Sequence, residues 1–102
     1  AIIINEESAS ASELLAIAMQ EKYKAIVVGV NSFGKGTVQE KVVLSTGASY
    51  KVTTKKWLSP NGKWINEVGV TPDIYIEGSK EWYNFSHEKD VQLQKALDEI
   101  TR

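Results

Sequence analysis

A serine-rich segment near the start of the chain has residue types that suit nucleophilic catalysis. Residues 8–13 read Ser-Ala-Ser-Ala-Ser-Glu, and they lie where an apolar run gives way to a helical pattern. Backbone N–H groups at a helix N-terminus lack intrahelical partners, and together with the helix dipole they can stabilise a developing oxyanion. With Ser10 as the nucleophile, the N–H of Ala11 is the natural oxyanion donor.

The same segment also fits a purely structural role. Ser10 and Glu13 stand three residues apart. This is the spacing of a capping box, in which a serine caps the helix and a glutamate reaches back to the serine N–H. From this segment alone, capping and catalysis both stay open.

A glycine-flanked lysine is the second group that suits catalysis. Lys35 lies between Gly34 and Gly36, and glycines permit the tight loops that direct a side chain inward. A serine hydroxyl needs a base, and a lysine serves as that base in the Ser–Lys variant of the serine triad. Because burial disfavours the charged form of lysine, we expect Lys35 to be buried and neutral. A solvated surface lysine is the alternative.

The lysine segment nearly matches a phosphate-binding P-loop. Gly29, Gly34 and Lys35 fit that pattern, but Gly36 stands where a hydroxyl would bind Mg²⁺. Residues 37–44 look extended, whereas a P-loop needs a helix N-terminus at that point. We therefore do not expect nucleotide binding.

A strand–helix–strand unit is predicted to carry both segments. Residues 2–5 and 25–30 are apolar runs typical of buried parallel strands, and residues 8–23 show helical spacing between them. The apolar residues of that helix are expected to face the core: Leu14, Leu15, Ala18 and Met19, with Ala11 one turn before Leu15.

The remaining pattern predicts a β-hairpin and a terminal helix. The β-rich runs 38–45 and 49–58 flank the turn residues Thr46-Gly47. A short strand is expected over 74–76, and an amphipathic helix over 87–100 with Val91, Leu93, Leu97 and Ile100 apolar. The predicted class is α/β, with a βαβ unit, a hairpin and a C-terminal helix.

The amino-acid composition excludes several kinds of functional site. The chain has 102 residues, no cysteine and a formal net charge of -1. A disulfide framework, a thiolate zinc site and a cysteine nucleophile are therefore excluded, and the charge does not favour nucleic acid. No metal or cofactor is expected. The chain opens on an apolar run, which we interpret as a strand of a longer protein.

Together the two segments resemble the carboxyl-terminal processing proteases (tail-specific proteases), a family of serine peptidases. The resemblance covers roughly residues 1–77. Its segments are Ile2–Asn5, Ser8–Glu13, Ala25–Gly29, Phe33–Gln39, Leu44–Gly47, Val52–Thr54, Trp57–Gly62 and Gly69–Asp73. Glu7 departs from the family pattern, which usually has glycine there.

The resemblance implies a role for each matching residue. Ser10 falls on the nucleophile, Lys35 on the general base and Gln39 on the residue that positions this lysine. Ala11 supplies an oxyanion N–H, and Glu13 is a neighbour of the site. The implied reaction is endopeptidase cleavage in C-terminal regions of proteins, by a Ser–Lys dyad through an acyl-enzyme.

The resemblance also implies a setting. Residues 1–102 would be the C-terminal part of a ClpP/crotonase-like catalytic core, without the upstream part and the PDZ domain, and hence weak or inactive alone. Protein or peptide substrates and an extracytoplasmic place (bacterial envelope, periplasmic or secreted) are implied. Exposed apolar residues at 82–85 would favour a homo-oligomer. The competing hypothesis is a non-catalytic module that binds a peptide along the hairpin edge.

Overall fold

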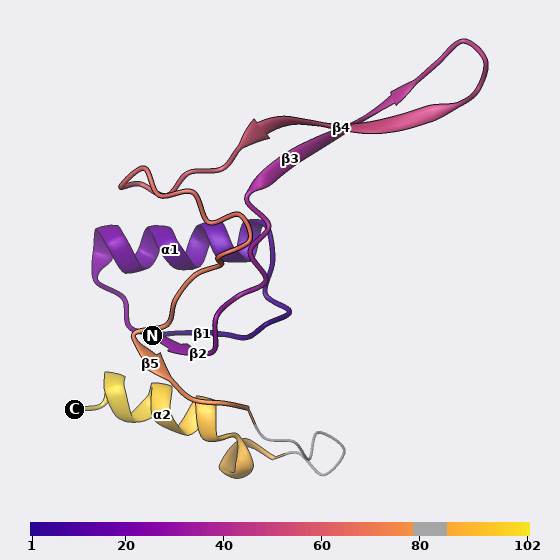
Figure 1. Ribbon diagram of the computed structural model, residues 1–102. Helices are drawn as coiled ribbons and strands as arrows, with labels where there is room; N and C mark the ends of the chain where they lie inside the picture. Colours follow the sequence, from indigo (N-terminus) through magenta and orange to yellow (C-terminus); the bar gives the residue numbers. More distant parts are fainter. Residues whose placement is uncertain (79–85) are drawn as a thin grey trace.

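The computed structural model describes residues 1–78 and 86–102 (Figure 1). The apolar segment at 82–85, on which the homo-oligomer prediction depends, lies outside the described residues. No helix among the described residues combines the length and the apolar character needed to cross a membrane.

A three-stranded parallel sheet forms the centre of the fold. Its strands are β1 (Ile2–Ile4), β2 (Val27–Gly29) and β5 (Ile74–Tyr75), in the order β1-β2-β5. Helix α1 (Ala11–Tyr23) connects β1 to β2, which pair in parallel. The predicted βαβ unit is therefore confirmed, and so is the α/β class.

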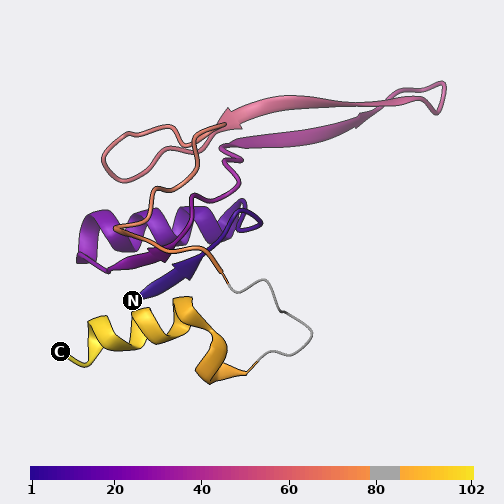
Figure 2. The ribbon, with the colours of Figure 1, turned by 60° about the horizontal axis from the view of Figure 1, so that its bottom comes forward.

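Two helices cover the sheet from opposite sides. In Figures 1 and 2, α1 lies on one face and α2 (Val91–Ile100) on the other. The main buried cluster fills the space between α1, the sheet and the 65–70 segment. Its members are Ile4, Ala16, Ile17, Val27, Ile65 and Val70. These contacts fix the start of α1 relative to the strand ends.

The predicted core face of α1 is wrong for two of its five residues, while Leu14, Ala18 and Met19 are half-buried. Leu15 is 63% exposed and Ala11 is exposed, whereas Glu13, Ala16 and Ile17 are buried. The helix turns Ala16 and Ile17 toward the sheet and places a carboxylate on the same buried face. A polar partner for that carboxylate must therefore come from another segment.

The predicted hairpin is confirmed. Strands β3 (Thr37–Val43) and β4 (Ser49–Lys56) pair antiparallel, with an irregularity between Val38 and Gln39. Both views show the hairpin projecting away from the helices and the sheet (Figures 1 and 2). Every residue of β4 is exposed, so this element adds little to the core.

The single terminal helix predicted over 87–100 is wrong. A 3₁₀ turn, η2 (His87–Lys89), precedes α2, and Asp90 between them has an extended conformation. The Asp90 side chain accepts a hydrogen bond from Leu93 N–H at 3.0 Å, so an N-cap starts a new helix there. Gln92 and Ala96 are the buried residues of α2, while most of the expected apolar stripe is exposed.

Candidate active site

Ser10 occupies a strained turn between β1 and α1. It is the N-cap of α1 with φ 54° and ψ −117°. An N-cap normally has extended backbone, and a non-glycine residue rarely adopts a positive φ. Such a conformation costs about 1–3 kcal/mol and tends to occur at functional sites. A serine on a sharp strand-to-helix turn is also how a nucleophile elbow exposes its hydroxyl.

Glu13 brings the serine and lysine segments together. It is 0% exposed, and its Oε2 atom accepts hydrogen bonds from Ser10 N–H at 2.9 Å and Lys35 N–H at 3.0 Å. The first bond is the glutamate half of the predicted capping box. The second links this cap to a loop 22 residues away in sequence. The backbones of Ser10 and Lys35 therefore meet at one carboxylate oxygen.

Residues 32–36, here called the lysine loop, are held by five consecutive backbone N–H groups. Each donates to a residue outside the loop. The acceptors, in order from residue 32, are Val70 O, Ser8 O, Glu13 Oε1, Glu13 Oε2 and Asn66 Oδ1. An irregular loop is thus fixed by tertiary hydrogen bonds on two sides, by Glu13 of α1 with Ser8 before that helix, and by the 66–70 segment.

A second set of contacts holds the outer side of the lysine loop. Gly36 O accepts from Trp57 N–H at 2.7 Å and from Trp64 Nε1–H at 2.9 Å, and Gly34 O accepts from Glu67 N–H at 2.6 Å. A Cβ on Gly36 would lie 2.7 Å from the backbone nitrogen of Asn66. The two glycines are therefore required by close backbone approach.

The part of residues 57–70 that contacts the lysine loop is here called the clamp. The sequence did not predict that Trp64, Asn66 and Glu67 belong to it. A signal was present, since glycines on both sides of the lysine and at position 69 indicate closely packed backbones. What the glycines could not indicate was which distant segment packs against them.

The expected burial of Lys35 is wrong for this chain. Gly34 and Gly36 are buried and Lys35 is exposed. The loop turns its two glycines toward the 66–69 segment, so the residue between them points the other way. The P-loop alternative also fails, because Lys35 is followed by strand β3 and not by a helix.

Gln39 lies apart from the lysine loop. It is exposed, pairs with Thr53 in the hairpin and follows the irregularity in β3. Within residues 1–78 and 86–102, no hydrogen bond joins it to Lys35. Ala11 is the first residue of α1 and is exposed.

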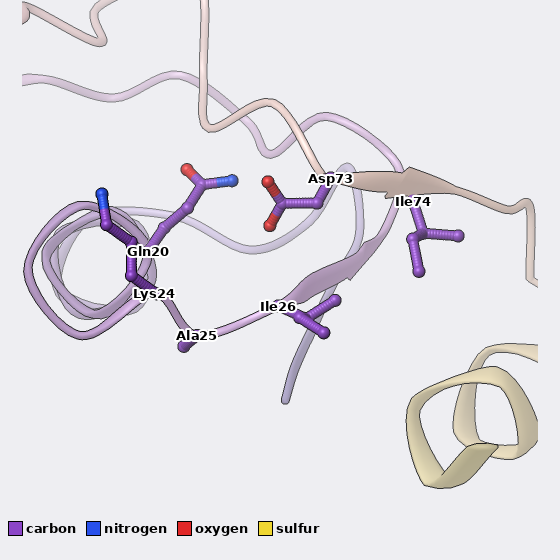
Figure 3. A pocket seen from close by; sticks show the side chains of 6 residues that line it. All are labelled: Gln20, Lys24, Ala25, Ile26, Asp73 and Ile74. Carbon is purple, nitrogen blue, oxygen red and sulfur yellow. The ribbon is translucent and has the colours of Figure 1, made fainter. Parts of the chain in front are cut away.

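A pocket of about 430 Å³ lies elsewhere, at the other end of α1. Figure 3 shows Gln20 of α1 and its C-cap residue Lys24 near Ile26 and Asp73, which directly precede β2 and β5. Ser10 is one helix length away, about 20 Å for 13 residues. The pocket is therefore separate from the serine and lysine segments.

The ordered segments and their geometry match a known family. The model of peptidase family S41 matches residues 1–76, which include the strained serine, Glu13, the lysine loop and the clamp. The chain belongs to peptidase family S41. The resemblance to carboxyl-terminal processing proteases is thereby confirmed over nearly the range that the sequence predicted.

Individual relatives of this chain support the same family assignment. The chain is 50% identical over 76 residues to the carboxy-terminal processing protease CtpB of Bacillus subtilis, covering 74% of this chain and 16% of CtpB. It is 39% identical over 101 residues to the carboxyl-terminal-processing protease of Synechocystis, covering 98% of this chain and 24% of that protein. The chain thus spans a quarter or less of these two relatives.

Solved structures support the same fold. The photosystem II D1 C-terminal processing protease matches with a TM-score of 0.69 and 39% identity, over 74% of this chain and 19% of that protein. Mature CPAF matches with a TM-score of 0.67 and 21% identity, over 96% of this chain and 18% of that protein. The second likeness extends the shared fold to most of the chain.

Proposed function

We propose that this chain is part of the catalytic domain of a serine endopeptidase in which Ser10 is the nucleophile and Lys35 the general base. The observation that carries the proposal is the convergence of the Ser10 and Lys35 backbones on Glu13 Oε2. A capping box accounts for the first of these two bonds but not for the second. The positive φ of Ser10 is likewise unusual for a cap.

The proposed reaction begins with proton transfer from Ser10 Oγ to the neutral amine of Lys35. The oxygen attacks the carbonyl carbon of the scissile peptide bond, and Ala11 N–H donates to the oxyanion that forms. The C–N bond then breaks, the leaving amine takes the proton from Lys35, and an ester remains on Ser10. A water molecule attacks that ester, and Lys35 again accepts a proton. The bond between the acyl carbon and Ser10 Oγ then breaks, Ser10 Oγ takes this proton back from Lys35, and the acyl group leaves as a carboxylic acid.

The supporting residues have positioning roles in this proposal. Glu13 sets the spacing of the two segments, because it accepts hydrogen bonds from both backbones. Gln39 is proposed to orient the Lys35 amine when substrate is bound, since apo sites are often looser than the reacting complex. A Lys35 that is exposed here must also be desolvated for the reaction, because water favours its charged form.

The setting of the reaction follows from the relatives. Their printed names describe processing at protein C-termini, so we propose protein C-terminal regions as substrates. We further propose the extracytoplasmic place of action that the family resemblance implies. Because the chain spans 16% and 24% of the length of those relatives, we propose that residues 1–102 alone are weak or inactive.

A chimera tests the dyad in a complete enzyme. Residues 1–76 replace the matching 76 residues of CtpB, to which they are 50% identical, and cleavage of a peptide with an apolar C-terminus is measured. Ser10→Ala and Lys35→Ala should each lower kcat by at least ~10³-fold. The matched controls Ser12→Ala and Lys22→Ala change exposed residues of α1 and should leave kcat within about twofold. An active Lys35→Ala chimera refutes the dyad.

A non-catalytic peptide-binding module is the second candidate. The observation that favours it is the projecting two-stranded hairpin, in which β3 and β4 pair with each other and with no other strand within residues 1–78 and 86–102. An extended peptide adds to such an edge by backbone hydrogen bonds. A serine-reactive phosphonate separates the two functions: labelling of the chimera at Ser10 supports the peptidase. Peptide binding without labelling, abolished by a proline in β4, supports the module.

A further inference from the structure

Ser32 is a buried serine at the centre of the lysine loop contacts. It is 7% exposed, and its hydroxyl lies 2.6 Å from Glu13 Oε1 and 2.7 Å from the backbone nitrogen of Val70. Its own backbone N–H donates to Val70 O at 3.2 Å. Ser32 therefore connects the Glu13 carboxylate to the 66–70 segment.

The direction of each hydrogen bond in this group is determined. The Val70 N–H can only donate, so Ser32 Oγ is its acceptor. The single hydroxyl proton of Ser32 then points to Glu13 Oε1. Gly34 N–H also donates to Oε1, while Ser10 and Lys35 donate to Oε2. Each of these four partners of Glu13 is a donor, and they are shared equally between its two carboxylate oxygens.

We infer that Ser32 is a positioning residue, which sets the geometry of the Ser10–Lys35 dyad by fixing the plane of the Glu13 carboxylate. This inference rests on the proposed function. With Oε1 held by Ser32 and Gly34, Oε2 is directed at the two backbones that carry the dyad. Without the hydroxyl, Oε1 keeps one donor, the carboxylate can rotate, and Val70 N–H loses its acceptor. A misplacement of about 1 Å at a catalytic group lowers the rate by as much as ~10²-fold.

The chain contains a matched control for this role. Ser59 is 5% exposed, its N–H donates to Lys63 O at 2.8 Å, and its Oγ accepts from Lys63 N–H at 3.0 Å. This is the same reciprocal pairing that Ser32 makes with Val70. Unlike Ser32, Ser59 makes no hydrogen bond to Glu13 among the described residues. Loss of either hydroxyl removes a buried acceptor, but only Ser32 also loses the contact with Glu13.

The test measures kcat and KM of the CtpB chimera with Ser32→Ala, Ser59→Ala or Glu13→Gln. Ser32→Ala should lower kcat by ~10–100-fold with KM within about threefold, because the dyad is misplaced and the binding surface is not. Ser59→Ala should leave kcat within about twofold. The double variant Ser32→Ala/Glu13→Gln should be no slower than Glu13→Gln alone, because Ser32 acts through Glu13.

Parental kcat in Ser32→Ala, or a fully multiplicative loss in the double variant, overturns the inference. If Ser32→Ala does not fold, Ser32→Cys replaces it, because a thiol fills the space but is a weak donor; parental kcat in that variant also overturns the inference. Inactive Ser10→Ala and Lys35→Ala beside a fully active Ser32→Ala refute only the role of Ser32. Active Ser10→Ala refutes the proposed function itself.

If the parent chimera has no activity, the inference is tested on the 102-residue chain instead. There Ser32→Ala should speed hydrogen exchange of the Gly34 and Lys35 amides by at least ~10-fold relative to Ser59→Ala, because local opening depends on the contacts that hold the loop. Equal exchange rates in the two variants overturn the inference.

Discussion

The lysine loop and the β3–β4 hairpin follow one another in the chain, yet they are ordered in opposite ways. The loop has no regular secondary structure, and its five N–H groups donate to residues of other segments. The hairpin has regular pairing, but its two strands form a separate sheet and all of β4 is exposed. Regular hydrogen bonding therefore gives local order, whereas a fixed position within the molecule requires tertiary partners.

The largest expected difference between the two regions comes from changing a glutamate in each. Glu13→Gln places an NH₂ group among four donors and should reduce the free energy of unfolding by about 3 kcal/mol or more. Glu40→Gln in the hairpin changes an exposed side chain and should shift it by less than about 0.5 kcal/mol. Urea unfolding of the 102-residue chain measures both, and equal losses would show that Glu13 is not the main connection of the loop.

Hydrogen exchange compares the two regions without any substitution. The amides of Gly34 and Lys35 donate to a buried carboxylate, whereas Leu44 N–H donates to Ala48 O at the exposed hairpin end. Because exchange reports the free energy of local opening, the two loop amides should exchange about 10²-fold more slowly than Leu44. Faster exchange in the loop would mean that the hairpin is the better-ordered region.

Two glycines with similar backbone angles sharpen the same contrast. Gly69 has φ +75°, and a Cβ there would lie 2.3 Å from the backbone oxygen of Ser32; Gly47 has φ +88° and nothing within 4 Å. Alanine at Gly47 should destabilise by about 1 kcal/mol through its backbone angle alone. Alanine at Gly69 adds a backbone clash and should cost about 2 kcal/mol more. Similar losses of stability in the two variants, measured by thermal unfolding, would show that the 66–70 segment adjusts to a Cβ as easily as the hairpin turn does.

Local patterns in the sequence predicted most of the fold. The apolar runs around α1 gave the βαβ unit, and Thr46-Gly47 between two β-rich runs gave the hairpin. Such patterns depend on residues close in sequence, where turn chemistry and periodicity act directly. The buried face of α1 was wrong, because periodicity ranks Leu15 above Glu13 while the lysine loop needs a buried acceptor. That need arises 20 residues further on, so no window on the helix reveals it.

The candidate site was predicted only in part for the same reason. The residue types and the two segments came from the sequence, and the S41 family match covers both of them. The clamp could not be predicted from the sequence, because its contacts join distant residues. Gly36 and Asn66 are 30 residues apart, and Ser32 and Val70 are 38 residues apart. Burial of Lys35 was expected from its flanking glycines, but those glycines are themselves the buried residues. The direction of the Lys35 side chain was therefore predicted wrongly.

The smallest expected effect lies within the hairpin, at a cross-strand pair whose two residues are exposed. Lys41 and Lys51 are direct partners in the β3–β4 register, and like charges in that position destabilise a pair of strands. Lys41→Glu makes the pair attractive and should slow hydrogen exchange of Leu44 to an extent equivalent to about 0.5 kcal/mol. Lys41→Glu/Lys51→Glu restores like charges and should remove the gain, and 1 M salt should shrink it by screening. The same gain in both variants would trace it to strand propensity, and a change in Gly34 exchange would show that the hairpin is coupled to the lysine loop after all.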